Sequence, residues 1–173
     1  IRVLGITAVP IRIVSLDDLP LAAERICDVL ECPNQQQIAE QFRARIKRLR
    51  STYQDNPPRR TFLQIGEQPL WTLGGSHLLS DALRPCGVIN VFESLTPPAA
   101  AISREQVIAL RPEIVLLNQH PQDGDWAQHW STWWTPGRPD APRFITLNPD
   151  LSLRPGPRIL DAVEYVCNAL AHQ

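Results

Sequence analysis

Apolar positions recur with strand spacing at the start of the chain and with helical spacing soon after. Residues 6–14 are mostly apolar and predict a strand, with Pro10 favouring an edge or a bulge. Ser15 and the two aspartates after it are typical of a helix start. One apolar face across residues 17–31 predicts the helix itself, which the sequence Pro33-Asn34 ends.

The clearest helical pattern covers residues 34–54. Apolar side chains recur there at spacings of four, four, three and four, at Ile38, Phe42, Ile46, Leu49 and Tyr53. Arginines and lysines of residues 43–50 fall on the other faces and indicate a solvated surface. At 1.5 Å per residue this helix is roughly 30 Å long, which is enough to cross a small domain and join two parts of a fold.

From residue 59 onward, strand and helix patterns alternate. The strands are expected at 60–66, 88–92, 113–118 and 143–147, and the helices at 77–85, 103–110, 123–134 and 157–171. A capping box, with Ser103 at the cap and Gln106 three residues later, opens the helix at 103–110. Residues 114–117 are all apolar, as in a strand covered on both faces.

This alternation predicts an α/β fold, a Rossmann-like lobe whose parallel sheet is flanked by helices. A long backbone helix and a remnant of a second lobe precede that lobe. We therefore divide the chain into 1–32, a strand and a helix that remain of an amino-terminal lobe, 33–57, a linker helix, and 58–173, a carboxy-terminal α/β lobe.

Composition narrows the class of protein. Hydrophobic residues form 43% of the 173 residues, so a core is expected and bulk disorder is excluded. The formal charge of -1 argues against a nucleic-acid binder, and no apolar run has the length of a membrane helix. There is no methionine and the chain opens at Ile1, so we expect a piece of a longer protein.

Motifs for catalysis or metal binding are not found. The sequence has no Gly-x-Ser-x-Gly elbow, no phosphate-binding loop with lysine and no His-Glu-x-x-His. The pair Gly74-Gly75 before a predicted helix fits either an anion site or a tight turn. The histidines are scattered, and we expect neither a catalytic residue nor a protein ligand to a metal.

Cysteines and tryptophans leave several interpretations open. The four cysteines allow three full pairings, and Cys27 and Cys32 form either a local pair or two buried thiols. Trp126, Trp130 and Trp133 share one stripe and favour core packing. Trp71 instead follows the carboxyl end of a predicted strand, where open parallel sheets bind ligands, and is a candidate ligand contact.

Several segments in fixed order resemble the cobalamin-type periplasmic substrate-binding proteins of ABC importers. This is the class whose two lobes are joined by one rigid helix, and it includes siderophore and haem binders. The segments are 59–66, 69–76, 83–92, 102–107, 157–160 and 166–170.

The resemblance implies a disulfide between Cys86 and Cys167, in keeping with an oxidising compartment. It implies that Glu105 is the carboxylate that docks on an ABC permease, which works with its ATPase. The protein is then expected in the periplasm, free or lipid-anchored on the outer face of the inner membrane. Its expected function is to capture cobalamin or a related corrinoid or metal chelate and to deliver it, with no chemistry and no cofactor of its own.

For the ligand site the resemblance points to a cleft between lobes, lined by the loops at 67–75, 93–101 and 148–154. The expected ligand-binding residues are Trp71, Thr72, Ile65, Asp150 and Arg154. Asp150 and Arg154 are equally able to form a local pair. Relatives carry a tryptophan where this chain has residues 97–101, and an aromatic where it has Ile65. A siderophore or haem is therefore an alternative ligand, and an enzyme or an interaction module on the same scaffold is an alternative function.

Overall fold

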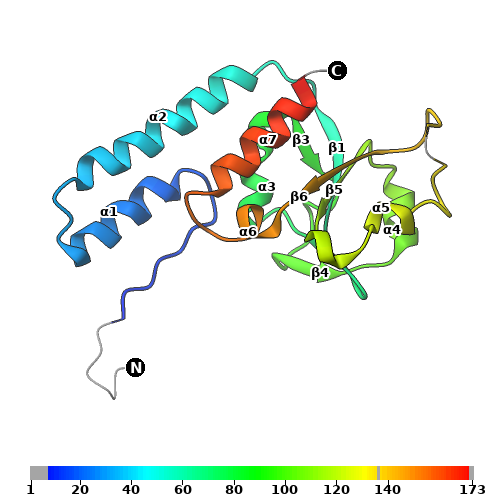
Figure 1. Cartoon of the computed structure of the whole chain (residues 1–173), viewed down its shortest axis with the longest axis horizontal. Helices are drawn as coiled ribbons and strands as arrows, with labels where there is room; N and C mark the ends of the chain where they lie inside the picture. The colour runs from blue at the N-terminus through cyan, green and yellow to red at the C-terminus, as the bar shows by residue number, and fades with distance from the viewer. Residues whose placement is uncertain (1–7, 136, 172–173) are drawn as a thin grey trace.

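A computed structural model describes residues 8–135 and 137–171, in which a mixed sheet is flanked by helices (Figure 1). The strands are β1 (Arg59–Glu67), β2 (Leu70–Leu73), β3 (Val88–Asn90), β4 (Ala99–Ala101), β5 (Ile114–Asn118) and β6 (Arg143–Leu147). The α-helices are α1 (Asp18–Leu30), α2 (Gln35–Tyr53), α3 (Leu78–Ala82), α4 (Arg104–Leu110), α5 (Trp126–His129), α6 (Pro149–Ser152) and α7 (Ile159–Ala171). Two 3-10 helices, η2 (Arg84–Cys86) and η3 (Pro121–Asp123), complete the described elements.

The parallel part of the sheet is built as the sequence predicts. β1 pairs in parallel with β3 along its first residues and with β5 on its other edge, and β5 pairs in parallel with β6. The five residues of β5 are all buried, which explains their uninterrupted apolar run. The prediction of an α/β lobe with helices on both faces is therefore confirmed.

The antiparallel part of the sheet was not predicted. β2 pairs antiparallel with the carboxyl end of β1, and β4 pairs antiparallel with β2. β2 occupies residues 70–73 of the loop expected at 67–75, and β4 occupies residues 99–101 of the loop expected at 93–101. The loop prediction is wrong for these residues, whereas residues 93–98 have no regular structure. β4 is a run of three alanines with little strand propensity of its own, and it is extended because β2 offers it an edge.

Two apolar clusters cover the two faces of the sheet. One lies between the sheet and the helices α2, α3 and α7, and includes Leu63, Leu79 and Val163. The other lies on the opposite face, where Phe62 packs edge-on against Phe92 and Trp130. Trp126 and Trp130 are buried in this second cluster, which confirms core packing for both.

The tryptophan-rich segment is less helical than expected. Asp125 caps α5 by accepting hydrogen bonds from the backbone N–H groups of Ala127 and Gln128, but the helix ends at His129. Trp130 then stacks on Trp134 with ring centroids 4.8 Å apart. The turns after His129 bring both rings onto the sheet, so aromatic packing is favoured over continuation of the helix.

The prediction of a strand over residues 6–14 is wrong for residues 8–14, which have no regular structure and are mostly exposed. Residues 6–7 lie outside the described part of the chain. A strand needs a hydrogen-bonding neighbour, and no described strand pairs with this segment. Apolar composition therefore does not suffice to form a strand here.

Helices α1 and α2 confirm the first two helical patterns and lie antiparallel beside each other (Figure 1). Arg50 of α2 makes two hydrogen bonds of 2.9 Å to Asp17 at the start of α1. On its other side, Arg45 binds both carboxylate oxygens of Glu164 in α7, at 2.9 and 2.8 Å. Helix α2 is thus tied to α1 and to the last helix of the lobe.

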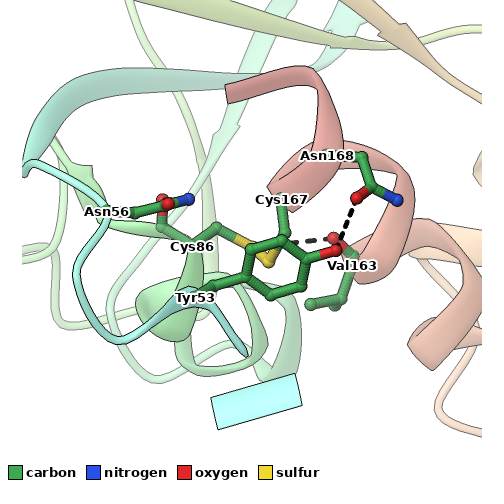
Figure 2. The surroundings of a disulfide bond; sticks show 6 residues. All are labelled: Tyr53, Asn56, Cys86, Val163, Cys167 and Asn168. Carbon is green, nitrogen blue, oxygen red and sulfur yellow. Dashed lines mark hydrogen bonds between the residues drawn. A yellow bond between two sulfur atoms is a disulfide. The ribbon is translucent and has the colours of Figure 1, made fainter. Parts of the chain in front are cut away.

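The structure contains the disulfide that the resemblance implied, between Cys86 and Cys167 (Figure 2). It joins η2 to α7 across 81 positions of sequence, with the two Cα atoms 4.6 Å apart. The hydroxyl of Tyr53, at the end of α2, lies beside it and donates to Asn168 at 2.5 Å. The end of the long helix α2 is therefore joined to α7 by a surface hydrogen bond, next to the buried disulfide that joins η2 to α7.

Candidate ligand-binding edge and docking surface

The carboxyl ends of the parallel strands form one edge, where ligands bind in open α/β sheets. Asn118, the last residue of β5, is buried at this edge. Its amide donates to the Gln64 carbonyl at 3.0 Å, and its side-chain oxygen accepts from the Ser152 hydroxyl at 2.7 Å. These two bonds fix the short helix α6, and with it the 148–154 segment, against the end of the sheet.

Trp71 lies beside the carboxyl end of β1, on strand β2 and not in a loop. It pairs with Gly66 on one side and with Ala101 on the other. The register between the strands shifts between Gln64 and Gly66, where an irregularity interrupts the ladder. The Trp71 side chain is 38% exposed, so a large apolar ring faces solvent at the predicted ligand edge.

Two further predicted contacts, Thr72 and Ile65, are less available. Thr72 is fully buried, and its hydroxyl donates to the Leu63 carbonyl at 2.9 Å. Ile65 is partly buried and packs against the apolar cluster under α3 and α7. Thr72 therefore holds the β1–β2 pair together. Only part of the Ile65 side chain is accessible to a ligand.

Asp150 and Arg154 form the local pair that was one of their two expected arrangements. Arg154 Nη2 lies 2.7 Å from Asp150 Oδ1, and both side chains are exposed. Asp150 is in the first turn of α6, where Asn148 caps the helix by accepting from the Asp150 backbone N–H at 2.9 Å. Both groups follow β6 and so lie at the same edge of the sheet as the end of β1.

The Gly74-Gly75 pair serves close backbone packing. Gly74 N–H donates to the Pro98 carbonyl at 3.0 Å, and Gly75 N–H donates to the Glu93 carbonyl at 3.2 Å. A Cβ on either glycine would lie 2.4 Å from a backbone oxygen, of Pro97 or of Glu93. Because both amides are already used, the anion-site interpretation is wrong and the tight-approach interpretation is confirmed.

A buried ionic network at the end of β1 was not predicted. Glu67, whose side chain is 9% exposed, accepts a hydrogen bond from the guanidinium of Arg104. It also accepts from the side chain of Gln64 at 2.5 Å, and His129 Nδ1 lies 3.1 Å from it. The network brings β1, α4 and α5 together at one carboxylate.

Aromatic rings cover the Arg104 end of this network. The guanidinium carbon lies 5.6 Å from the ring centroid of Trp130 and 5.3 Å from that of Trp133. Gln64 links the rings back to the sheet, because its side-chain oxygen accepts from Trp130 Nε1 at 2.9 Å. One signal was present in the sequence. The positive charge of an arginine in the first turn of a helix is repelled by the positive end of the helix dipole, so a carboxylate outside the helix is expected as its partner.

Glu105 follows Arg104 in the first turn of α4 and is exposed. The capping box predicted for this helix is present, with Ser103 accepting from the Gln106 N–H and Gln106 bonding back to the Ser103 N–H. The Glu105 backbone N–H, the Ser103 hydroxyl and the charge of Arg104 lower the pKa of the Glu105 carboxyl. A hollow of about 500 Å³ beside it is lined by residues of the network, including Glu67 and Trp133.

The described residues contain neither a candidate metal site nor a candidate membrane-spanning helix. Over 8–135 and 137–171, no three or more histidine, cysteine or carboxylate side chains are grouped so as to hold a metal ion. Within the same ranges, no helix combines the length and apolar character needed to cross a membrane.

Comparison with known proteins gives related sequences, although no family model matches the chain. The vitamin B12-binding protein of Yersinia pestis (strain Pestoides F) is 34% identical over 157 residues, which cover 90% of this chain and 54% of that protein. The vitamin B12-binding protein of Vibrio cholerae (serotype O1, strain O395) is 33% identical over 172 residues, covering 98% and 62%. This chain thus spans about half to three fifths of the length of these curated relatives.

A solved structure extends the likeness to three dimensions. The crystal structure of the periplasmic vitamin B12-binding protein of Vibrio cholerae superposes with a TM-score of 0.83 at 30% identity, covering 99% of this chain and 67% of that one. The periplasmic haem-binding protein of Roseiflexus sp. RS-1 shares the fold, with a TM-score of 0.75 at 22% identity. All of these names describe binding proteins.

Proposed function

This chain belongs to the family of periplasmic vitamin B12-binding proteins, and from that premise we propose that it is the solute-binding part of an ABC importer. It captures cobalamin or a related corrinoid or metal chelate and delivers it to a membrane permease that works with an ATPase. The protein acts by binding and release and needs no catalytic residue. Its place is the periplasm, free or anchored by lipid to the outer face of the inner membrane.

The observation that carries this proposal is the exposed indole of Trp71 at the carboxyl edge of the sheet. A macrocyclic ligand offers a broad apolar face, and an aromatic ring that is already held by two neighbouring strands binds such a face with little loss of conformational freedom. Ile65 supplies a smaller apolar contact beside it. Thr72 contributes by holding β2 on β1.

The Asp150–Arg154 pair supplies the polar part of the proposed site. Peripheral amides of a corrinoid both donate and accept hydrogen bonds, and a carboxylate next to a guanidinium matches both functions. Because the pair is exposed, it can exchange its mutual contact for contacts to a ligand at small cost. A haem presents carboxylates, which would engage Arg154 and leave Asp150 opposed, so the pair favours the corrinoid over haem.

Docking on the permease is assigned to Glu105. The Glu105 carboxylate is charged at neutral pH, as an ordinary glutamate is, and its lowered pKa extends that charge toward more acidic conditions. The capped first turn of α4 holds it at the surface. Exposed charges on a rigid element favour fast association and ready release. This suits a contact that forms and breaks in each transport cycle.

A ligand panel tests the proposal. The purified protein is titrated by calorimetry with cobalamin, cobinamide, haem and a ferric hydroxamate siderophore, and absorbance follows the corrin and haem bands. Saturable binding of cobalamin or cobinamide, with weaker binding of haem, supports the corrinoid assignment. Tighter binding of haem or of the siderophore would contradict the corrinoid assignment and identify that compound's class as the ligand. Binding of none of the four would contradict a role in metal-chelate capture.

A further inference from the structure

The two remaining cysteines, Cys27 and Cys32, flank the end of α1. Glu31 adopts a left-handed conformation with φ of 52°, and its N–H donates to the Cys27 carbonyl. The Cys32 N–H donates to the same carbonyl at 3.0 Å. The second bond is the one that closes a Schellman turn, and a contact between the side chains at the positions of Cys27 and Cys32 frequently accompanies such a helix end.

Backbone geometry brings the two residues within reach of a covalent bond. With a 3.0 Å bond from the Cys32 nitrogen to the Cys27 oxygen, standard bond lengths place the two Cα atoms less than about 7 Å apart. Disulfides are found at Cα separations of roughly 4.4–6.8 Å. Side chains agree with the backbone, because a hydrogen bond between the thiols raises the pKa of Cys27 to about 11, with burial adding to the effect.

The turn is also held in place from outside. Gln35, in the first turn of α2, donates to the Glu24 carbonyl at 3.2 Å and to the Asp28 side chain at 2.5 Å. These bonds pin the start of α2 onto the last turns of α1 and fix the segment that carries Cys32. The two thiols therefore face each other in a turn with little freedom to separate.

We infer that Cys27 and Cys32 form a second disulfide, which clips the end of α1 to the residue before the α1–α2 turn. The chain already carries the Cys86–Cys167 disulfide, so an environment that oxidises that pair also meets this one. Cys27 is buried and Cys32 is partly exposed, so Cys32 is the residue that an incoming oxidant reaches.

The oxidant is a disulfide-exchanging molecule, such as oxidised glutathione or a protein dithiol oxidase in its disulfide form. The Cys32 thiolate attacks one sulfur of that disulfide, and its other sulfur leaves as a thiol. Cys27 loses its proton and attacks the Cys32 sulfur, which forms the bond between the two cysteines and releases the second thiol. The two cysteines lose two electrons and two protons, which the external disulfide gains as its two thiols.

Peptide mapping tests this inference directly. Trypsin cuts after Arg25 and Arg43, so both cysteines fall in the peptide of residues 26–43. The protein is purified from an oxidising compartment, denatured with an alkylating agent and digested without reductant. We expect this peptide unalkylated and about 2 Da lighter than its reduced form. Cleavage after Glu31 should then give fragments 26–31 and 32–40 that separate after reduction and not before.

The peptide that links Cys86 to Cys167 is the internal control for an oxidising history. In protein where that link is intact, recovery of residues 26–43 with both cysteines alkylated would overturn the inference, as would either cysteine joined to a small thiol. A Cys32→Ala variant provides the matched comparison. There Cys27 should be alkylated after denaturation, while the same residue in the unchanged protein is protected.

Discussion

A Cβ atom placed on Gly66 would lie 3.3 Å from both Cβ and Cδ1 of Trp71, so the indole lies directly on bare backbone. The two residues are partners across the β1–β2 pair, at the point where its register shifts. The position of the Trp71 ring at the ligand edge thus depends on a neighbour that has no side chain.

Replacement of Gly66 by valine is expected to push the Trp71 ring aside and to weaken corrinoid binding about tenfold, or roughly 1.4 kcal/mol. Calorimetric titration measures the affinity, and circular dichroism checks that the fold is kept. Gly156→Ala is the matched control, because a Cβ at Gly156 meets nothing within 4 Å. Equal affinities for the Gly66→Val variant and the control would contradict the placement of Trp71 in the site.

The Cys86–Cys167 disulfide closes a loop of 81 positions, and loss of such a cross-link should lower the free energy of unfolding by about 4 kcal/mol. Urea unfolding of a Cys86→Ala/Cys167→Ala variant measures this loss against the unchanged protein. Both proteins are compared again in reductant, where most of the difference should vanish. A large difference that persists in reductant would show that packing of the sulfur atoms, rather than the cross-link, stabilises the fold.

The Glu67 carboxylate is nearly buried, and removal of Arg104 takes away its guanidinium partner. We expect Arg104→Met to reduce the free energy of unfolding by about 3 kcal/mol, the lower end for a broken buried ion pair, because part of the Arg104 side chain is exposed. Changing both residues, as Arg104→Met/Glu67→Met, should restore part of the loss. The Glu67→Met single variant completes the cycle. If the losses of the two single variants simply add in the double variant, the ion pair does not couple α4 to the end of β1.

Substitution of the docking carboxylate should separate delivery from capture. Glu105→Gln is expected to weaken the apparent affinity for the permease at least about tenfold, measured as stimulation of the permease ATPase against protein concentration, and to leave ligand affinity unchanged. Because its pKa is lowered, the carboxylate stays ionised as pH falls from 8 to 5 and the contact should persist over that range. The control is Glu40→Gln, which changes an exposed glutamate on α2. An equal loss of apparent permease affinity in both variants would contradict a docking role for Glu105.

The elements that the sequence predicted well are those whose pattern and packing agree. The periodic apolar face of α2 and the apolar run of β5 each correspond to surfaces that the fold buries. Residues 8–14 and β4 show the opposite case. The first is apolar and has no strand partner, and the second has weak propensity and is extended by pairing with β2. Pairing with a neighbouring strand determines the conformation of both segments, and this pairing cannot be read from a single sequence.

The candidate site divides in the same way. Trp71 was located from residue type and position after a strand, and the structure keeps it exposed at that edge. Thr72 was expected to face the ligand, but alternation along β2 turns its hydroxyl inward to the Leu63 carbonyl. Glu67 and Arg104 are 37 positions apart in the sequence, and their contact depends on how α4 packs against the end of β1.

In the proposed function, the exposed ring of Trp71 binds the apolar face of a corrinoid. The most direct measurement is a cobalamin titration of the unchanged protein and of Trp71→Ala, side by side and with matched thermal stability. We expect saturable one-to-one binding that is at least about tenfold weaker in the variant. Binding of equal affinity in both proteins, or no binding of cobalamin to the unchanged protein, would contradict it.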